Sequence, residues 1–233
     1  MSAYPTTIAI DGPAASGKTT VGRMLAEALD YLFLDTGCMY RAATLAALDA
    51  NIDLENETAV AHLTTQLNMR ILPPGNQDDG RVYTVLLDDQ DVTWRLRDPA
   101  VDANVSRIAS ILGVRQELVR RQHTIGQQGQ VVMVGRDIGT VVMPDAPLKL
   151  YVTASAEERA RRRWEDRRDQ GHEDADYDAI LADVNRRDQL DGNRRHSPMR
   201  PADDAIILDT TKQSPAEVVQ HILSLLSIPK SVS

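Results

Sequence analysis

The chain contains the stretch Gly12-Pro13-Ala14-Ala15-Ser16-Gly17-Lys18-Thr19, which fits the phosphate-binding pattern G-x-x-x-x-G-K-S/T. In such a loop the glycines let successive backbone N–H groups point at a phosphate, and the following helix adds the positive end of its dipole. Lys18 is expected to reach the β- and γ-phosphate oxygens, and Thr19 to offer its hydroxyl to Mg²⁺. The stretch therefore predicts a nucleotide-phosphate site and the strand–loop–helix unit that carries it.

The residues around this loop fit that unit and extend it. Residues 6–10 form a short β-branched run, and apolar residues recur at helical spacing after Lys18. Four further apolar runs are typical of buried parallel strands; they cover residues 31–34, 131–134, 148–152 and 205–208. Helical patterns separate them, and Ser155 and Ser214 each precede a Glu by three residues, the capping-box spacing of a helix start. The alternation predicts an α/β fold with a five-stranded parallel sheet flanked by helices.

One segment departs from this alternation. Between residues 68 and 94, short apolar runs are separated by Pro73-Pro74-Gly75 and by Asp88-Asp89, both of which are turn material. This pattern predicts a small antiparallel β insert. After it, Asp98-Pro99 starts a further helical pattern.

Composition excludes several classes of protein. The 233 residues carry a formal charge of -8 and are 42% apolar, so we expect a globular chain that binds neither nucleic acid nor other long polyanions. No apolar run approaches the length of about 18 residues that a membrane span needs, and no signal-peptide pattern opens the sequence. The lone Cys38 fits a reducing compartment, so we expect a cytoplasmic protein.

Arginine is unusually frequent. There are 22 Arg against four Lys, and 11 of the Arg lie between Ala156 and Arg200 without any Lys. Codon bias together with helix-surface ion pairs is one explanation. The other is that guanidinium groups bind phosphates bidentately, which lysine cannot do.

Absent motifs and the positions of two arginines narrow the class of phosphate-binding protein. The D-x-x-G and N-K-x-D motifs of regulatory GTPases are missing, and so is the LSGGQ-like element of transport ATPases. Arg41 and Arg136 instead follow predicted strands, and ligands of open α/β sheets bind beyond the carboxyl ends of strands. A second, phosphate-bearing substrate is the natural inference.

Several motifs together resemble those of bacterial cytidylate kinases, over nearly the whole chain. They are Asp11-Gly12-Pro13, Leu34-Asp35-Thr36-Gly37 with Tyr40-Arg41, the run from Gly135 to Val142 (GRDIGTVV), and Arg187-Asp188 ahead of Asp191 and Arg194. The resemblance implies one P-loop kinase unit over residues 1–233. Within it, an acceptor-binding region would cover about residues 38–105, including the insert at about 68–94, and a short lid would cover about residues 159–176.

The resemblance also implies an activity: transfer of the γ-phosphoryl group of ATP, with Mg²⁺, to CMP or dCMP. The implied ATP-binding residues are Gly12, Pro13, Ala14, Ala15, Ser16, Gly17, Lys18, Thr19 and Thr20. The implied CMP-binding residues are Thr36, Arg41, Ser106, Arg115, Arg136, Asp137, Asp191 and Arg194, where Arg41, Arg136 and Arg194 would hold the phosphate and Asp191 the ribose. The implied catalytic residues are Lys18, Arg136, Arg187, Arg159 and Arg163, the last two as lid arginines.

The chemistry of the base supports the cytosine assignment. Cytosine offers an amino donor at N4 and acceptors at N3 and O2, which complement the carboxylate of Asp137 and the guanidinium of Arg115. Uracil would place O4 against the carboxylate. Two alternatives remain at this point: a kinase for UMP or AMP, and a non-catalytic nucleotide-sensing protein. We expect small nucleotides as partners, no nucleic acid or membrane, and a monomer.

Overall fold

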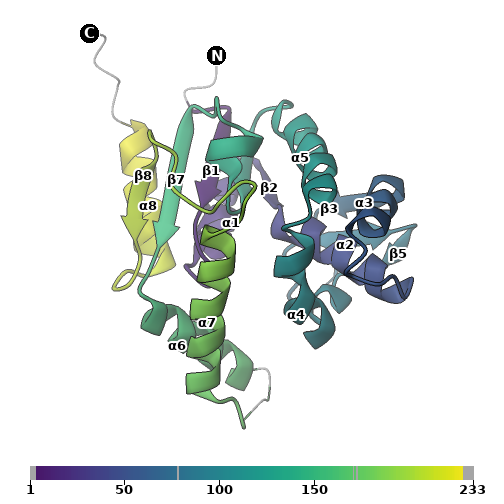
Figure 1. Ribbon diagram of the computed structural model, residues 1–233. Coiled ribbons are helices and arrows are strands. Elements are labelled where there is room, and N and C mark those ends of the chain that lie inside the picture. Colours follow the sequence, from purple (N-terminus) through teal and green to yellow (C-terminus); the bar gives the residue numbers. More distant parts are fainter. Residues whose placement is uncertain (1–3, 78, 170, 172, 228–233) are drawn as a thin grey trace. The chain divides into compact units, whose positions relative to one another are not determined.

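The computed structural model describes residues 4–77, 79–169, 171 and 173–227 (Figure 1). The chain forms two compact units. One, called the core unit here, comprises Met1–Leu34 and Gly126–Ser233; the other, called the second unit, comprises Asp35–Ile125.

The core unit is built on a five-stranded sheet with the strand order β2-β6-β1-β7-β8. Its strands are β1 (Thr7–Asp11), β2 (Leu32–Asp35), β6 (Val131–Val134), β7 (Leu148–Thr153) and β8 (Ile206–Asp209). The pairs β1–β6, β1–β7 and β7–β8 are parallel, with Ile10 opposite both Val134 and Leu150. The predicted parallel sheet is confirmed, and every strand lies within one residue of its expected range.

Helices of the core unit follow strands as the sequence predicts, except for one that follows another helix. They are α1 (Lys18–Leu29), α6 (Ala156–Asp169), α7 (Tyr177–Gly192) and α8 (Pro215–Ser227), with a π-helical turn η2 (Ile138–Val142) after β6. Apolar side chains of α1 and α8 pack in one cluster with those of the strands. Both predicted capping boxes begin helices: the backbone N–H of Glu158 donates to Ser155 Oγ, and that of Glu217 donates to Ser214 Oγ.

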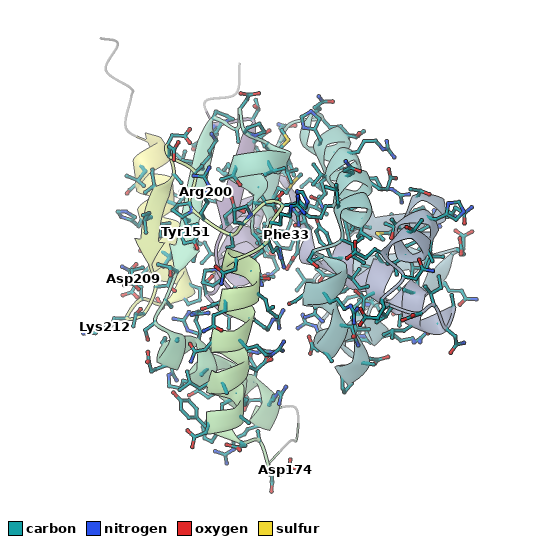
Figure 2. The ribbon with its side chains drawn as sticks, in the orientation of Figure 1. Phe33, Tyr151, Asp174, Arg200, Asp209 and Lys212 are labelled. Carbon is teal, nitrogen blue, oxygen red and sulfur yellow. The ribbon has the colours of Figure 1, made fainter. Side chains whose placement is uncertain are left out.

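One expectation for the sheet needs correction. The run at residues 205–208 was expected to be buried, but β8 is an edge strand, and Ile207 is 62% exposed. Only Leu208 of this strand is buried, where it packs with α8. Figure 2 labels Tyr151 on β7 and Asp209 at the end of β8.

The second unit combines helices with a small antiparallel sheet. Its elements are α2 (Gly37–Asp49), α3 (Glu57–Gln66), β3 (Met69–Leu72), β4 (Thr84–Leu87), β5 (Gln90–Asp91), η1 (Arg95–Arg97), α4 (Pro99–Ile108) and α5 (Leu112–Gly126). The strand order β3-β4-β5 confirms the predicted antiparallel insert. Asp88 and Asp89, with φ of 47° and 65°, form the tight turn between β4 and β5, where both central residues need positive φ.

The region predicted as a lid, about residues 159–176, covers most of α6 and the segment before α7. Residues 170 and 172 of that range lie outside the described residues, and Gly171 has a φ of 89°. The lid and the acceptor-binding region remain predictions. Among the helices described, none combines the length and the apolar character needed to cross a membrane.

Candidate active site

The loop between β1 and α1 has the backbone that a phosphate site requires. Gly12 has a φ of 148°, and a Cβ atom there would lie 2.0 Å from the carbonyl oxygen of Val152. Gly17, with a φ of 86°, precedes the first residue of α1. Gly12 therefore excludes any side chain, and the positive φ of Gly17 favours glycine there.

Two further residues of this loop indicate a ligand. Ala15 has a φ of 59°, a conformation that costs a non-glycine residue about 1–2 kcal/mol. The hydroxyl of Ser16 is buried and has no hydrogen-bond partner among the described residues, although a buried hydroxyl normally has one. A phosphate oxygen above the loop would supply that partner.

Lys18 is buried at the start of α1, and its Nζ donates a 2.7 Å hydrogen bond to the carbonyl oxygen of Pro13. The ammonium group is therefore held on the loop. Hydrogen bonds from elsewhere in the core unit hold the loop in place. Thr210 Oγ1 donates to the carbonyl oxygen of Ser16 at 3.0 Å, and Arg162 donates to the carbonyl oxygen of Thr210 at 2.6 Å.

Two of the predicted phosphate-binding arginines share one carboxylate. Arg136 Nε donates to Asp191 Oδ2 at 2.8 Å, and Arg194 Nη2 donates to Asp191 Oδ1. Burial alone would raise the pKa of Asp191, but Arg136 and Arg194 lower it below its ordinary value, so the carboxylate stays ionised. Arg136 also donates to the carbonyl oxygen of Gly12 at 3.2 Å, which places its guanidinium at the phosphate loop.

Arg159, predicted as a lid arginine, is only 4% exposed. Its Nη1 and Nη2 donate to the two carboxylate oxygens of Asp188 at 3.0 and 2.5 Å, and Nη1 also donates to the carbonyl oxygen of Ala14 at 3.2 Å. The side chain thus connects α6 and α7 to the phosphate loop. Arg163, one turn further along, pairs with Asp183 at 3.0 Å, and Arg187 is buried on α7.

Four predicted acceptor-binding residues belong to the second unit. Arg41 on α2 donates to the carbonyl oxygen of Leu96 at 2.8 Å and to Asp102 Oδ1 at 2.7 Å. Arg115 on α5 is buried, with its guanidinium carbon 5.6 Å from the ring centroid of Tyr40. The other two are Thr36, buried at the N-cap of α2, and Ser106, partly buried on α4.

Asp137, the predicted cytosine-reading residue, is buried in the core unit at the start of η2, where its backbone carbonyl accepts from Val141 N–H at 2.9 Å.

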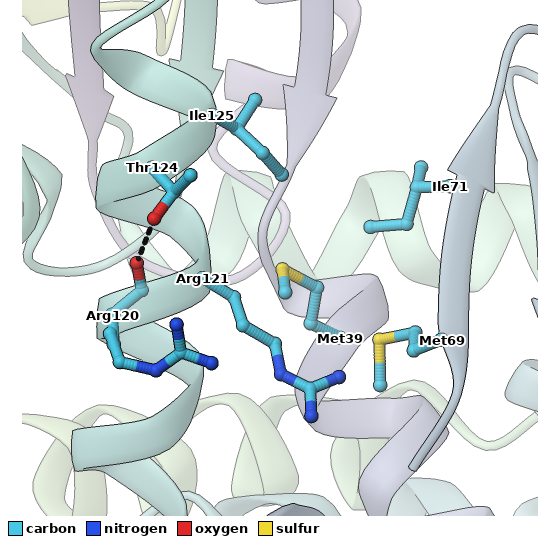
Figure 3. A pocket seen from close by; sticks show the side chains of 7 residues that line it. All are labelled: Met39, Met69, Ile71, Arg120, Arg121, Thr124 and Ile125. Carbon is cyan, nitrogen blue, oxygen red and sulfur yellow. Dashed lines mark hydrogen bonds between the residues drawn. The ribbon is translucent and has the colours of Figure 1, made fainter.

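The second unit also contains a cavity of about 240 Å³, lined by Met39, Met69, Ile71, Arg120, Arg121, Thr124 and Ile125 (Figure 3). No predicted site residue lines it. Arg121 is already engaged there, since it donates to Glu117 at 2.6 Å and to the carbonyl oxygen of Leu67 at 2.8 Å.

Metal ligands are sparse on the protein side. In the described part of the chain, no cluster of three or more His, Cys, Asp or Glu side chains could hold a metal ion. A cation held chiefly by substrate phosphates and water, with one protein hydroxyl, does not need such a cluster.

Sequence reasoning missed two acidic residues that support the site. Asp188 forms the bidentate pair with Arg159, and Asp11 accepts hydrogen bonds from two backbone N–H groups of η2. Both lie inside recognisable sequence motifs, but a motif does not show which partner a side chain has.

Comparisons with known proteins show the family. A family model described as Cytidylate kinase matches residues 8–227. The cytidylate kinase of Chloroflexus aggregans is 51% identical over 220 residues, which are 94% of this chain and 93% of that protein. The cytidylate kinase of Roseiflexus castenholzii is 48% identical over 223 residues, 96% of this chain and 94% of that protein. The cytidylate kinase of Bacillus velezensis is 46% identical over 221 residues, 94% of this chain and 95% of that protein.

Proposed function

The chain belongs to the cytidylate kinase family, and we propose how its residues divide the work of phosphoryl transfer from ATP to CMP. The acceptor is itself a phosphate, already anionic near neutral pH, so the reaction needs no strong general base. What it needs is alignment of two anionic groups and neutralisation of their charge.

The donor side rests on the phosphate loop. The backbone N–H groups of residue 12 and residues 14–20, the hydroxyl of Ser16 and the ammonium group of Lys18 would bind the phosphates of ATP. The hydroxyl of Thr19 would contribute to Mg²⁺ binding, and the remaining ligands would be phosphate oxygens and water. When bound, Mg²⁺ supplies charge neutralisation at the transferring group.

The acceptor side rests on the arginines. The observation that carries the proposal is the Arg136–Asp191–Arg194 cluster beside the phosphate loop, with Arg136 also bonded to Gly12. We propose that Arg136, Arg194 and Arg41 bind the CMP phosphate, and that Asp191 holds two of them in place and contacts the ribose. Three further arginines would act on the transferring group: Arg187, Arg159 and Arg163. The contact of Arg159 with Ala14 indicates that Arg159 can also act by holding the phosphate loop.

Base selection would come from Asp137 and Arg115, with Thr36 and Ser106 as further hydroxyl contacts. A buried carboxylate accepts from the cytosine amino group and repels the O4 of uracil. We propose that dCMP is accepted as well as CMP. The monomeric state and the cytoplasmic location remain predictions.

A coupled ADP-release assay over CMP, dCMP, UMP and AMP, with ATP and Mg²⁺, tests this assignment. We expect turnover with CMP and dCMP and a lower kcat/KM for UMP and AMP. A preference for UMP or AMP would contradict base selection by Asp137 and Arg115. Absence of turnover with all four would favour a nucleotide-sensing role instead.

A further inference from the structure

Asp11, the last residue of β1, lies outside every binding role proposed above. Its Oδ1 accepts a 2.7 Å hydrogen bond from the backbone N–H of Ile138, and its Oδ2 accepts one of 2.7 Å from Gly139. The side chain is 3% exposed, so water does not compete for these bonds. The carboxylate therefore joins the end of β1 to the first two residues of η2.

The two N–H groups follow directly after Arg136 and Asp137 in the chain. They lie in the first turn of η2, where backbone donors have no acceptor within the turn. A carboxylate satisfies both because each oxygen accepts one bond, whereas an asparagine would turn its NH₂ group toward one of the donors.

Residue 139 is buried close to both β1 and β7, so a large side chain there would have to displace its neighbours. A Cβ atom on Gly139 would lie 3.1 Å from Lys149 Cδ and 3.4 Å from Asp11 Oδ2. Glycine thus lets the turn approach both β1 and β7 closely.

The anchor for the contact is a strand that is paired on both sides. Asp11 lies opposite Tyr151 of β7, and Ile10 lies opposite Val134 of β6. Gly135 N–H also donates to the carbonyl oxygen of Ile10 at 2.9 Å. The segment from Gly135 to Gly139 is therefore fixed to β1 at both of its ends.

We propose that Asp11 is a positioning residue for the acceptor nucleotide: its carboxylate fixes the turn that presents Arg136 and Asp137 to CMP. This inference rests on the roles proposed for those two residues. It predicts that loss of the carboxylate impairs the handling of CMP more than that of ATP, because the paired strand still carries the phosphate loop.

The protonation of Asp11 gives this role a pH dependence. Burial raises its pKa to about 6, the two backbone hydrogen bonds and Lys18 oppose the rise, and Asp137 adds to it. Tyr151 and Lys149 on β7 also face this region. A protonated carboxyl group has lost one acceptor, so the contact with η2 weakens as pH falls through about 6.

Steady-state kinetics of Asp11→Asn against wild type test the proposal. We expect the KM for CMP to rise about tenfold or more while the KM for ATP stays within about threefold, in a variant that melts cooperatively. Asp209→Asn is the matched control, since Asp209 ends β8 and accepts a 2.9 Å backbone hydrogen bond from Thr211; it should change neither KM. Equal changes in both KM values, or an unchanged KM for CMP, would overturn the positioning role.

A second variant decides the matter if Asp11→Asn does not fold. Gly139→Val keeps the carboxylate but adds atoms beyond a Cβ position that already lies 3.1 Å from Lys149 Cδ and 3.4 Å from Asp11 Oδ2 in a buried turn. It should raise the KM for CMP with little change for ATP; an unchanged KM for CMP would overturn the proposal. Arg136→Lys, assayed alongside, separates the role proposed for Arg136 from the role proposed for Asp11. If that variant handles CMP normally, the role proposed for Arg136 fails, whereas a normal Asp11→Asn beside a defective Arg136→Lys refutes Asp11 alone.

Discussion

Arg136 donates a 2.8 Å hydrogen bond from Nε to Oδ2 of Asp191, a residue 55 positions further along the chain. The carboxylate is buried and also pairs with Arg194. Both guanidinium groups are therefore oriented before an anion binds, because each is hydrogen-bonded to Asp191. This pre-organisation is what binding of a small dianion to two adjacent cations requires.

Lys18→Ala removes the ammonium group that we propose neutralises the transferring phosphoryl group. We expect kcat to fall by about two to three orders of magnitude, since electrostatic contacts formed in the transition state are of that size. Rapid-quench or coupled kinetics at saturating ATP and CMP measure this. A near-normal kcat would remove Lys18 from the mechanism.

Arg159→Ala removes the buried guanidinium that bonds to Asp188 and to the carbonyl oxygen of Ala14. We expect a loss of about 2–3 kcal/mol in the free energy of unfolding, because the carboxylate and the carbonyl lose charge-assisted partners. Urea unfolding measures it.

Arg161→Ala is the matched control for that variant, since Arg161 lies on the same helix and pairs with Glu158 at 2.8 Å while half exposed. Its loss should change the free energy of unfolding much less than the loss of Arg159, because an exposed ion pair is screened by water. Equal effects of the two substitutions would refute a supporting role for Arg159 at the phosphate loop.

The raised pKa of Asp11 makes a prediction about stability. The group ionises near its ordinary value of 3.8 in the unfolded chain but near pH 6 in the folded protein, because burial disfavours its charge. Between those values the unfolded state binds fewer protons, so this group lowers the free energy of unfolding as pH rises. As the pH rises from 4 to 7, the free energy of unfolding of Asp11→Asn should therefore rise by about 2–3 kcal/mol relative to that of the wild type. Urea unfolding at both pH values checks this; a pH-independent difference would contradict it.

Asp137→Asn tests base selection. An amide can present either its oxygen or its NH₂ group, so uracil no longer meets a fixed negative charge. We expect the ratio of kcat/KM for CMP to that for UMP to fall by about tenfold or more, chiefly through weaker discrimination against UMP. An unaltered ratio would argue against carboxylate readout.

The sequence predicts the strands and most helices of the core unit well, because local sequence specifies each of them. The glycines of the phosphate loop, the capping serines Ser155 and Ser214, and the β-branched runs each specify their own conformation. The turn at Asp88-Asp89 was recognised for the same reason.

Other features depend on distant partners. Helix α2 shows no clear apolar stripe because most of its residues are buried, including alanines on several sides, so periodicity does not reveal it. The exposure of Ile207 follows from the position of β8 at the sheet edge. The contacts of Asp11 with η2 join residues 127 and 128 positions apart, which no local pattern can show.

Two causes contribute to the excess of arginine over lysine: ion pairs on helix surfaces, and groups of arginines placed to bind anions. Arg161 pairs with acidic neighbours on an exposed helix surface, as a helix ion pair does. Arg136 and Arg194 are instead gathered on one buried carboxylate, an arrangement that suits a planar fork of donors.

The most direct test of the account is kcat/KM for CMP in Arg136→Lys, measured with ATP saturating and compared with Arg195→Lys, an exposed neighbour of the cluster. A lysine keeps the charge of Arg136, but its three N–H donors diverge from one nitrogen and do not reproduce the planar fork that would reach Asp191, Gly12 and a phosphate. We predict a fall of about 10- to 100-fold for Arg136→Lys, with less than a twofold change for Arg195→Lys. An unchanged kcat/KM for CMP in Arg136→Lys would contradict the proposal that this cluster binds the acceptor phosphate.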